Sequence, residues 1–287
     1  MTKKQQKKMT IIFAVIGVLL LAGVFLTMGK TGQEEDIVTV IRDAVVHDTN
    51  RVTFFGMEVN PGLISGLVVT GILTVFALIV RIFVIPKFTL VPGRFQMILE
   101  TLVGYFSGLS EESSPRKNKL LSAYVFAAGV YIFTGTMLEL FGFQVVTTNG
   151  GSIALPAPLS DINGAIMMGC TSYLFILAGG LINNGAGSLK EALKEFSLPI
   201  SMSFRLFGAL LSGAIVTELV YYYTALSYVL PVLVGVLFTC LHALIQAYVL
   251  TMLVALFYGE FSEPSEKKLK KLAAKAQKKE LQVADAA

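Results

Sequence analysis

A small group of ionisable side chains lies within or beside long apolar stretches of this sequence. They are Glu139, Asp161, Arg205, Glu218 and His242, accompanied by the amide of Gln246. Inserting a charged side chain at the centre of a bilayer costs about 2.5–3.5 kcal/mol, so such a residue is by default a candidate for function. Carboxylates and imidazole exchange protons, whereas a guanidinium keeps its charge. These residue types therefore favour the movement or blocking of ions.

Arg205 and Gln246 are expected to face each other. His242 and Gln246 are four residues apart, so they project from one face of a helix. An antiparallel hairpin that turns near Leu230 brings the level of Arg205 close to that of Gln246. Two simpler interpretations stay open: Arg205 extends to the inner membrane surface, or the polar side chains only join two helices by a hydrogen bond.

Other kinds of chemistry find little support. Cys170 and Cys240 lie in apolar runs, and His47 and His242 are far apart, so neither a disulfide framework nor a metal motif is indicated. The sequence contains no dinucleotide fingerprint, phosphate-binding loop or nucleophile elbow. We therefore expect no catalytic residues, no metal and no cofactor on this chain.

The elements that position these residues are predicted to be membrane helices. Of the 287 residues, 54% are hydrophobic and 15% are charged, against about 25% charged residues in a typical soluble domain. About 20 mainly apolar residues are needed for one crossing. The stretches that qualify are Thr10 to Met28, Leu63 to Val84, Leu120 to Phe143, Ile162 to Ile182, Leu198 to Val229 and Pro231 to Tyr258.

The predicted fold class is thus an all-α integral membrane protein with about six transmembrane helices. The last two stretches are longer than a perpendicular crossing requires, which indicates a tilted C-terminal hairpin. Asn60-Pro61-Gly62 begins the second stretch, and Pro86 ends it. The first stretch has two interpretations, a retained anchor helix or a cleaved signal peptide, and its length favours the anchor.

Gly93 to Ser114 is predicted to be an interfacial amphipathic helix. Its apolar residues recur every three or four positions: Phe95, Ile98, Leu99, Leu102, Phe106 and Leu109. Such a helix is expected to lie on the membrane surface. The alternative is a cytoplasmic helix that packs against a soluble partner.

The distribution of basic residues predicts the orientation. Lys3 to Lys8, Arg81 to Lys119, Lys190 to Lys194 and Lys267 to Lys279 fall on one side when six crossings are threaded. Since Lys and Arg are retained in the cytoplasm, both termini are expected inside if the first helix is retained. The predicted organisation is an N-terminal anchor and extracytoplasmic segment (1–60), a membrane domain (61–263) and a basic cytoplasmic tail (264–287).

Two motifs contain the intramembrane arginine and glutamine. Ser197 to Gly208 reads Ser-Leu-Pro-Ile-Ser-Met-Ser-Phe-Arg-Leu-Phe-Gly, and Leu244 to Leu253 contains Gln246. They resemble the first and second signatures of one family, subunit a of F-type ATP synthases. Two further matches are Pro92 to Gln96 with Glu100, and Pro158 to Asn163. In combination these motifs are specific, and the resemblance covers about Phe54 to Glu263.

The resemblance implies roles for particular residues. Arg205 would face a rotating ring of small two-helix c subunits, and Gln246 would lie beside it. Asp161 and Asn163 would lie at the outer mouth of an aqueous half-channel. Beyond what the resemblance implies, we expect Glu139, Glu218 and His242 to deliver protons from outside and the polar inner end around Ser203 to drain them. The resemblance also implies peripheral-stalk b subunits and membrane lipid as partners, no nucleic acid, and a bacterial-type inner membrane as location.

The sequence also departs from the family pattern. Ala209 replaces a common Asn, Ala214 replaces an acid or histidine, and Thr239 stands where a complementary residue usually occurs. Glu218 and His242 are instead each displaced by about one turn. We expect water, rather than a direct hydrogen bond, to connect these two in one cavity.

A further departure is Glu139, an acid where the family pattern more often has glycine. It is interpreted either as part of the channel or as a structural residue that faces a loop.

The implied function is passage of protons to and from the rotor through two half-channels, with Arg205 as the barrier. The alternatives are a sodium-translocating version of the same subunit, a secondary transporter, and a structural assembly factor. A transporter usually shows inverted repeats and broken helices, which the sequence lacks. An assembly factor would leave Arg205 and Gln246 unexplained.

Overall fold

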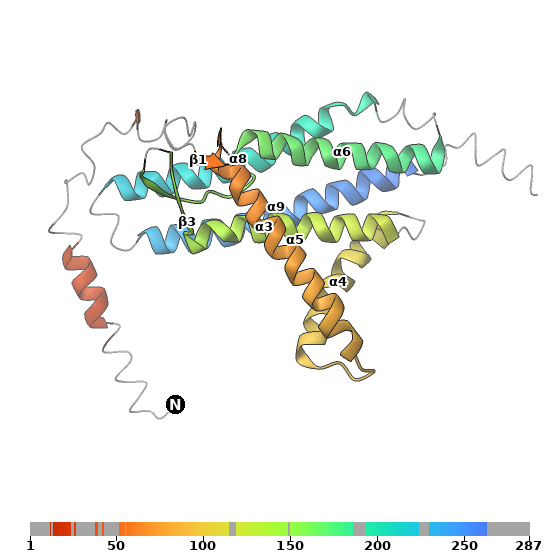
Figure 1. Ribbon diagram of the computed structural model, residues 1–287, viewed down its shortest axis with the longest axis horizontal. Coiled ribbons are helices and arrows are strands. Elements are labelled where there is room, and N and C mark those ends of the chain that lie inside the picture. Colours follow the sequence, from red (N-terminus) through yellow and green to blue (C-terminus); the bar gives the residue numbers. More distant parts are fainter. Residues whose placement is uncertain are drawn as a thin grey trace, which may run out of the picture. The chain divides into compact units, whose positions relative to one another are not determined.

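The protein is described by a computed structural model. It covers residues 52–262 except 55, 115–118, 149, 186–192 and 224–229, together with short stretches before residue 52, of which 14–23 is the longest. The long elements are helices (Figure 1). They are α3 (Pro61–Ile79), α4 (Arg94–Ser113), α5 (Lys119–Phe141), α6 (Ile162–Asn184), α8 (Ser197–Tyr222) and α9 (Leu230–Ser262).

The helices confirm the predicted all-α membrane fold. Within the described part of the chain, five helices are long and apolar enough to cross a membrane: Pro61–Lys87, Lys119–Phe141, Ile162–Ile182, Ser197–Tyr222 and Val234–Ser262. The remaining predicted span, Thr10 to Met28, is described mainly as a short apolar helix, Ala14–Gly23, and its other residues lie largely outside the described part of the chain. The turn expected near Leu230 also involves residues outside it.

The start and the end of α3 follow the sequence signals. The side-chain carbonyl of Asn60 accepts a hydrogen bond from the Gly62 amide at 2.9 Å, and Pro61 occupies the first turn, where its missing N–H costs nothing. Beyond Ile79 the helix continues as a π-helical segment, η1 (Val80–Val84), and a 3-10 turn, η2 (Ile85–Lys87), which contains Pro86. The chain is extended at Phe88, so Pro86 ends the helix as predicted.

Helix α4 occupies nearly the whole of the predicted amphipathic segment. Phe106, within the apolar stripe, is buried, whereas Phe95, Ile98 and Leu102 are exposed. A stripe of exposed apolar residues matches the expectation of a helix that lies on a membrane surface, which remains a prediction.

The chain divides into two compact units. One comprises residues 1–69, 134–161 and 206–245, and the other comprises 70–133, 162–205 and 246–287. Each of α3, α5, α8 and α9 therefore contributes one part to each unit.

In the second unit, α5, α6 and α9 pack through aromatic rings and glycines. The ring of Phe175 on α6 stacks on Tyr124 of α5 at 4.1 Å and on Tyr258 of α9 at 5.3 Å between ring centroids. A Cβ atom at Gly179 would overlap the Tyr258 ring, and one at Gly259 would overlap the Ser113 carbonyl. Small residues therefore permit the close approach typical of membrane helices.

The first unit also contains two short hairpins that the sequence analysis did not predict. They are β1 (Val52–Phe54) with β2 (Met57–Val59), and β3 (Gln144–Val146) with β4 (Ser152–Ala154). Gly56 in the first turn has φ of 80°, a conformation that glycine adopts without steric cost. Strands of three residues are too short for a recognisable alternation of apolar and polar positions.

Candidate functional site

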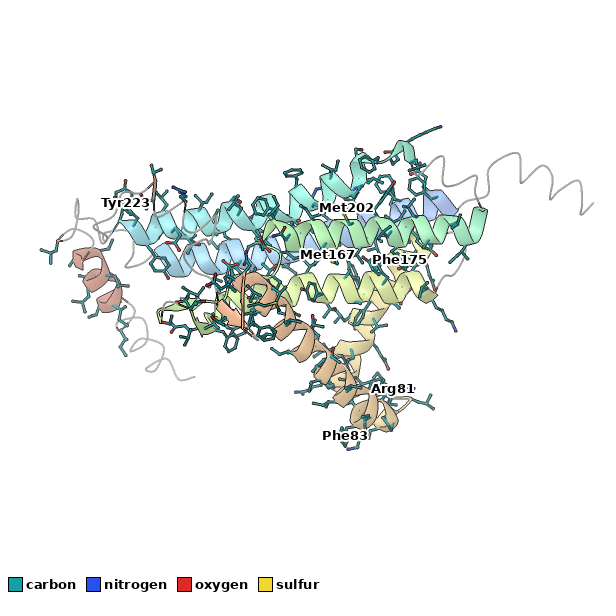
Figure 2. The ribbon with its side chains drawn as sticks, turned by 45° about the horizontal axis from the view of Figure 1, so that its top comes forward. Arg81, Phe83, Met167, Phe175, Met202 and Tyr223 are labelled. Carbon is teal, nitrogen blue, oxygen red and sulfur yellow. The ribbon has the colours of Figure 1, made fainter. Side chains whose placement is uncertain are left out.

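Arg205 lies on the exposed side of α8. Leu198, Met202, Leu206 and Leu210 recur every four residues and are all buried, which defines the packed face of this helix. Met202, which belongs to this packed face, is labelled in Figure 2. Arg205 is exposed instead. The position is about two turns into α8, because the helix begins at Ser197. The guanidinium is therefore a fixed charge on the outer surface of an apolar helix.

Gln246 holds α9 at the level of Arg205. Its side chain is 5% exposed, and its amide Nε2 donates to the backbone carbonyl of Arg205 at 3.4 Å. The predicted level of these two residues is thus confirmed, although the hydrogen bond goes to the backbone of Arg205. The guanidinium takes no part in this bond. The Oε1 atom of Gln246 is buried and has no hydrogen-bond partner within the part of the chain that the structure describes.

A small polar pocket lies in the first unit, among α5, α8 and α9. Its polar lining residues are Thr136 and Glu139 from α5, Thr217 from α8, and Thr239 and His242 from α9. Its volume is about 10 Å³, which is close to the minimum that one water molecule requires. A carboxylate, an imidazole and hydroxyl groups around such a space form a setting in which a water can connect titratable groups.

The orientation of His242 is set by its own helix. Nδ1 lies 2.8 Å from the Phe238 carbonyl oxygen, and the two rings stack with centroids 5.5 Å apart. A carbonyl can only accept, so Nδ1 carries the proton in this hydrogen bond. In the neutral ring Nε2 is then the nitrogen that can accept a proton.

Glu218 and His242 are not both in this pocket. Thr217 lines it, whereas Glu218, one residue further along α8, is partly exposed and is not a lining residue. Among the acids predicted from the sequence, it is Glu139 that shares the pocket with His242. This pocket is therefore not the cavity expected between Glu218 and His242, and a water connection between those two residues stays a prediction.

Asp161 and Asn163 lie at the start of α6. Asp161 is partly exposed, and its Cβ lies 3.0 Å from the position a Cβ would take on Gly62, at the beginning of α3. Asn163 is exposed in the first turn of α6. Both residues are thus at a helix end, and neither lines the polar pocket.

Ser203 is a packing residue in the described structure. It is 5% exposed, and its hydroxyl donates to the Pro199 carbonyl at 2.7 Å. A Cβ on Gly169 of α6 would overlap its Oγ atom, so α6 and α8 approach closely here. Ser201, two residues earlier, is exposed instead.

Thr136 and Thr217 are pocket residues that the sequence analysis did not identify. Thr136 precedes Glu139 by three residues and therefore shares its helix face, as Thr239 does with His242. The spacing of hydroxyl residues around the intramembrane charges was the signal that could have found them. Among the described residues, no group of three or more His, Cys, Asp or Glu side chains could hold a metal ion.

The long apolar helices define a multi-pass membrane protein. The fixed cation on one helix face and the titratable groups around a water-sized pocket suit it to ion movement. Comparison with known proteins gives the particular family. The family model described as "ATP synthase A chain" matches residues 64–259, and the chain belongs to this family.

Similar proteins agree with this assignment. ATP synthase subunit a of a Cereibacter sphaeroides strain is 26% identical over 192 residues, which cover 58% of this chain and 69% of that protein. ATP synthase subunit a of Beijerinckia indica is 25% identical over 196 residues, which cover 61% and 78%. The chain is therefore a membrane stator subunit that takes part in ion translocation, and it has no catalytic site for ATP.

Proposed function

We propose that this chain passes protons to and from a rotor ring through two aqueous half-channels, and that Arg205 separates them. The observation that carries the proposal is the exposed Arg205 side chain on an apolar helix, at the level of the buried Gln246 amide. Exposing a cation to lipid costs free energy, and a rotor carboxylate would give this cation a partner.

The barrier follows from the permanent charge of arginine. The guanidinium favours the ionised form of a rotor carboxylate that passes it, so the carboxylate releases its proton there. The same charge repels a proton that would cross directly between the half-channels. The membrane supplies the driving force, because moving one charge through 100 mV is worth about 2.3 kcal/mol.

The polar pocket is proposed as part of the outer half-channel. A water between Glu139 and His242 could pass a proton to Nε2 of the imidazole, while Nδ1 stays bound to the Phe238 carbonyl. Asp161 and Asn163 are proposed at the outer mouth, and Glu218 is assigned a secondary part in the same route. The inner exit is proposed near Ser201, with Ser203 as its buried neighbour.

Protons are favoured over sodium by the presence of an imidazole in the pocket, because His exchanges protons near neutral pH and does not bind sodium well. The sodium alternative is supported by the hydroxyl oxygens of Thr136, Thr217 and Thr239 beside a carboxylate, since hard cations prefer oxygen ligands. Initial rates of ATP-driven transport with and without sodium at constant pH distinguish the two ions.

The proposed partners are a ring of small c subunits against Arg205 and b subunits of the peripheral stalk. The proposed location is a bacterial-type inner membrane with both termini in the cytoplasm. Co-purification of the intact complex with a ring of two-helix subunits tests the partner assignment. Recovery of the chain from native membranes without such a ring would contradict it.

Cysteine accessibility tests the channel assignment. Cys170 and Cys240 are first replaced by Ala, and single cysteines are introduced at Glu139, His242 or Ser201. A small membrane-impermeant thiol reagent is expected to reach the first two positions from outside and Ser201 from the cytoplasm. Leu174→Cys, at an exposed apolar position of α6, is the control and should not react from either side. Reaction of Glu139→Cys and His242→Cys only from the cytoplasm would invert the assignment.

A further inference from the structure

A large apolar cavity lies in the second unit, between α3 with η1, α4 and α5. Its volume is about 920 Å³, and apolar side chains such as Phe76, Leu102, Phe126 and Val130 make up most of its lining. None of the proposed ion-translocation residues lines it. The cavity therefore needs an explanation separate from ion translocation.

The charged groups in the lining are Arg81 and Glu100. Glu100 Oε1 already accepts a hydrogen bond from Gln96 Nε2 at 2.7 Å, one turn earlier on α4. Arg81 is exposed and lies in η1, close to the end of the helix that leads towards α4 (Figure 2). Short π-helical segments are rare and frequently occur at functional sites. The lining thus combines an apolar interior with a cation near one end of a predicted span.

The chemistry of the lining favours a lipid as the occupant. A glycerophospholipid combines flexible apolar chains with one anionic phosphate, and the lining combines apolar side chains with Arg81 near the end of a predicted span. A flexible hydrocarbon chain can follow the cavity without the width of about 10–12 Å that a helix with side chains occupies.

We propose that the cavity binds one membrane glycerophospholipid, with an acyl chain in the apolar interior and the phosphate bound to the Arg81 guanidinium. The planar guanidinium donates two parallel hydrogen bonds to phosphate oxygens, which is the geometry for which arginine is preferred. Bilayer lipid has access, because only 6% of the apolar window of the Pro61–Lys87 span is buried.

The phosphate contact is tested with a phosphatidylglycerol that carries a diazirine on one acyl chain. It is added in increasing amounts to the purified complex in detergent, and the adducts on α3, α4 and α5 are quantified by mass spectrometry. Arg81→Gln is expected to require about tenfold more lipid for half-maximal labelling, the effect of losing one charge-assisted contact. Lys87→Gln removes a nearby cation that does not line the cavity, so it should label like the wild type.

The apolar part is tested by filling the cavity. Gly104 lines it and Gly108, one turn later on α4, does not, and a Cβ at either glycine meets no atom within 4 Å. Gly104→Phe combined with Ala127→Phe should reduce labelling of the lining peptides several-fold, whereas Gly108→Phe should leave it unchanged.

Three results would overturn the proposal. One is equal labelling of Arg81→Gln and Lys87→Gln, and another is equal labelling of the filled variant and Gly108→Phe. The third is a polypeptide adduct instead of a lipid adduct when a photoreactive amino acid replaces Val130 in the native complex. A diacylglycerol with the same diazirine chain lacks the phosphate and should label the wild type weakly.

Discussion

Two polar regions of this chain differ in what their charges can do. At Arg205 and Gln246 a permanently charged group is exposed, and the neighbouring amide is buried and bound to the backbone. Around Glu139 and His242, groups that can gain and lose protons surround a space of about 10 Å³. The first region contains one cation that cannot exchange a proton, whereas the second contains a carboxylate, an imidazole and hydroxyls.

This difference suggests a division of labour within one subunit. A fixed charge has no substitute, because no water or neighbouring hydroxyl can supply a permanent positive charge. A titratable residue beside water can be replaced in part, because the water and the remaining polar groups still offer a route. Substitutions in the two regions should therefore differ in severity.

The largest effect is expected at Arg205. Arg205→Ala and Arg205→Lys should both reduce ATP-driven proton pumping to background, the second because a lysine can lose its proton in an environment of low polarity. Quenching of a pH-sensitive dye in inverted membrane vesicles measures pumping, and immunoblotting checks insertion. Vesicles of either variant that acidify at the wild-type rate would rule out the barrier role.

A smaller effect is expected at Glu139. Glu139→Gln should slow proton-driven turnover by about tenfold, which is less than the 10²–10⁴-fold that positioned proton transfer contributes, because water and the hydroxyl groups can still provide a route. Glu218→Gln is the matched comparison and should slow turnover less, since Glu218 does not line the pocket. If Glu218→Gln is the more severe substitution, the route runs past α8 rather than α5.

His242 should affect the pH dependence more than the maximal rate. His242→Ala removes the proton-accepting Nε2 but leaves the remaining polar lining of the pocket, so turnover should fall a few-fold and its pH profile should change. Leu241→Ala, at an exposed neighbouring position of α9, serves as the control. An unchanged pH profile in His242→Ala would remove this residue from the relay.

The smallest effect is expected at Gln246. Gln246→Leu loses one neutral hydrogen bond to the Arg205 carbonyl, worth about 0.5–1.5 kcal/mol, but it also removes a buried acceptor, Oε1, that has no partner among the described residues. Turnover should fall less than in Glu139→Gln. Complete loss of pumping in correctly inserted Gln246→Leu would mean that the amide acts directly on the transported ion.

Much of the fold could be predicted because membrane helices can be recognised from their long runs of apolar residues. Hydropathy and the Pro61 and Pro86 signals gave the span now described as α3 with η1 and η2, and the three-to-four spacing gave α4. The hairpins at Gly56 and beyond Phe141 were missed, because three-residue strands carry no usable pattern.

The site was predictable to a lesser degree. Antiparallel register was enough to bring Gln246 to the level of Arg205, since both are tied to the rise of a helix. The acid that shares a pocket with His242 could not be predicted, because it depends on which face α5 turns towards α8 and α9. The spacing of Thr136 and Glu139 shows that they share a helix face but does not show which way that face turns, and it is Glu139 that lines the pocket with His242.

The central claim, that Arg205 keeps two half-channels apart, is tested most directly in complexes whose rotor ring cannot turn. The ring is crosslinked to this chain in membrane vesicles, and passive proton flux is measured after a potential is imposed. Crosslinked wild-type vesicles should be tight, whereas crosslinked Arg205→Ala vesicles should conduct protons, because the electrostatic barrier has gone. Arg205→Ala vesicles as tight as the wild type would contradict the claim.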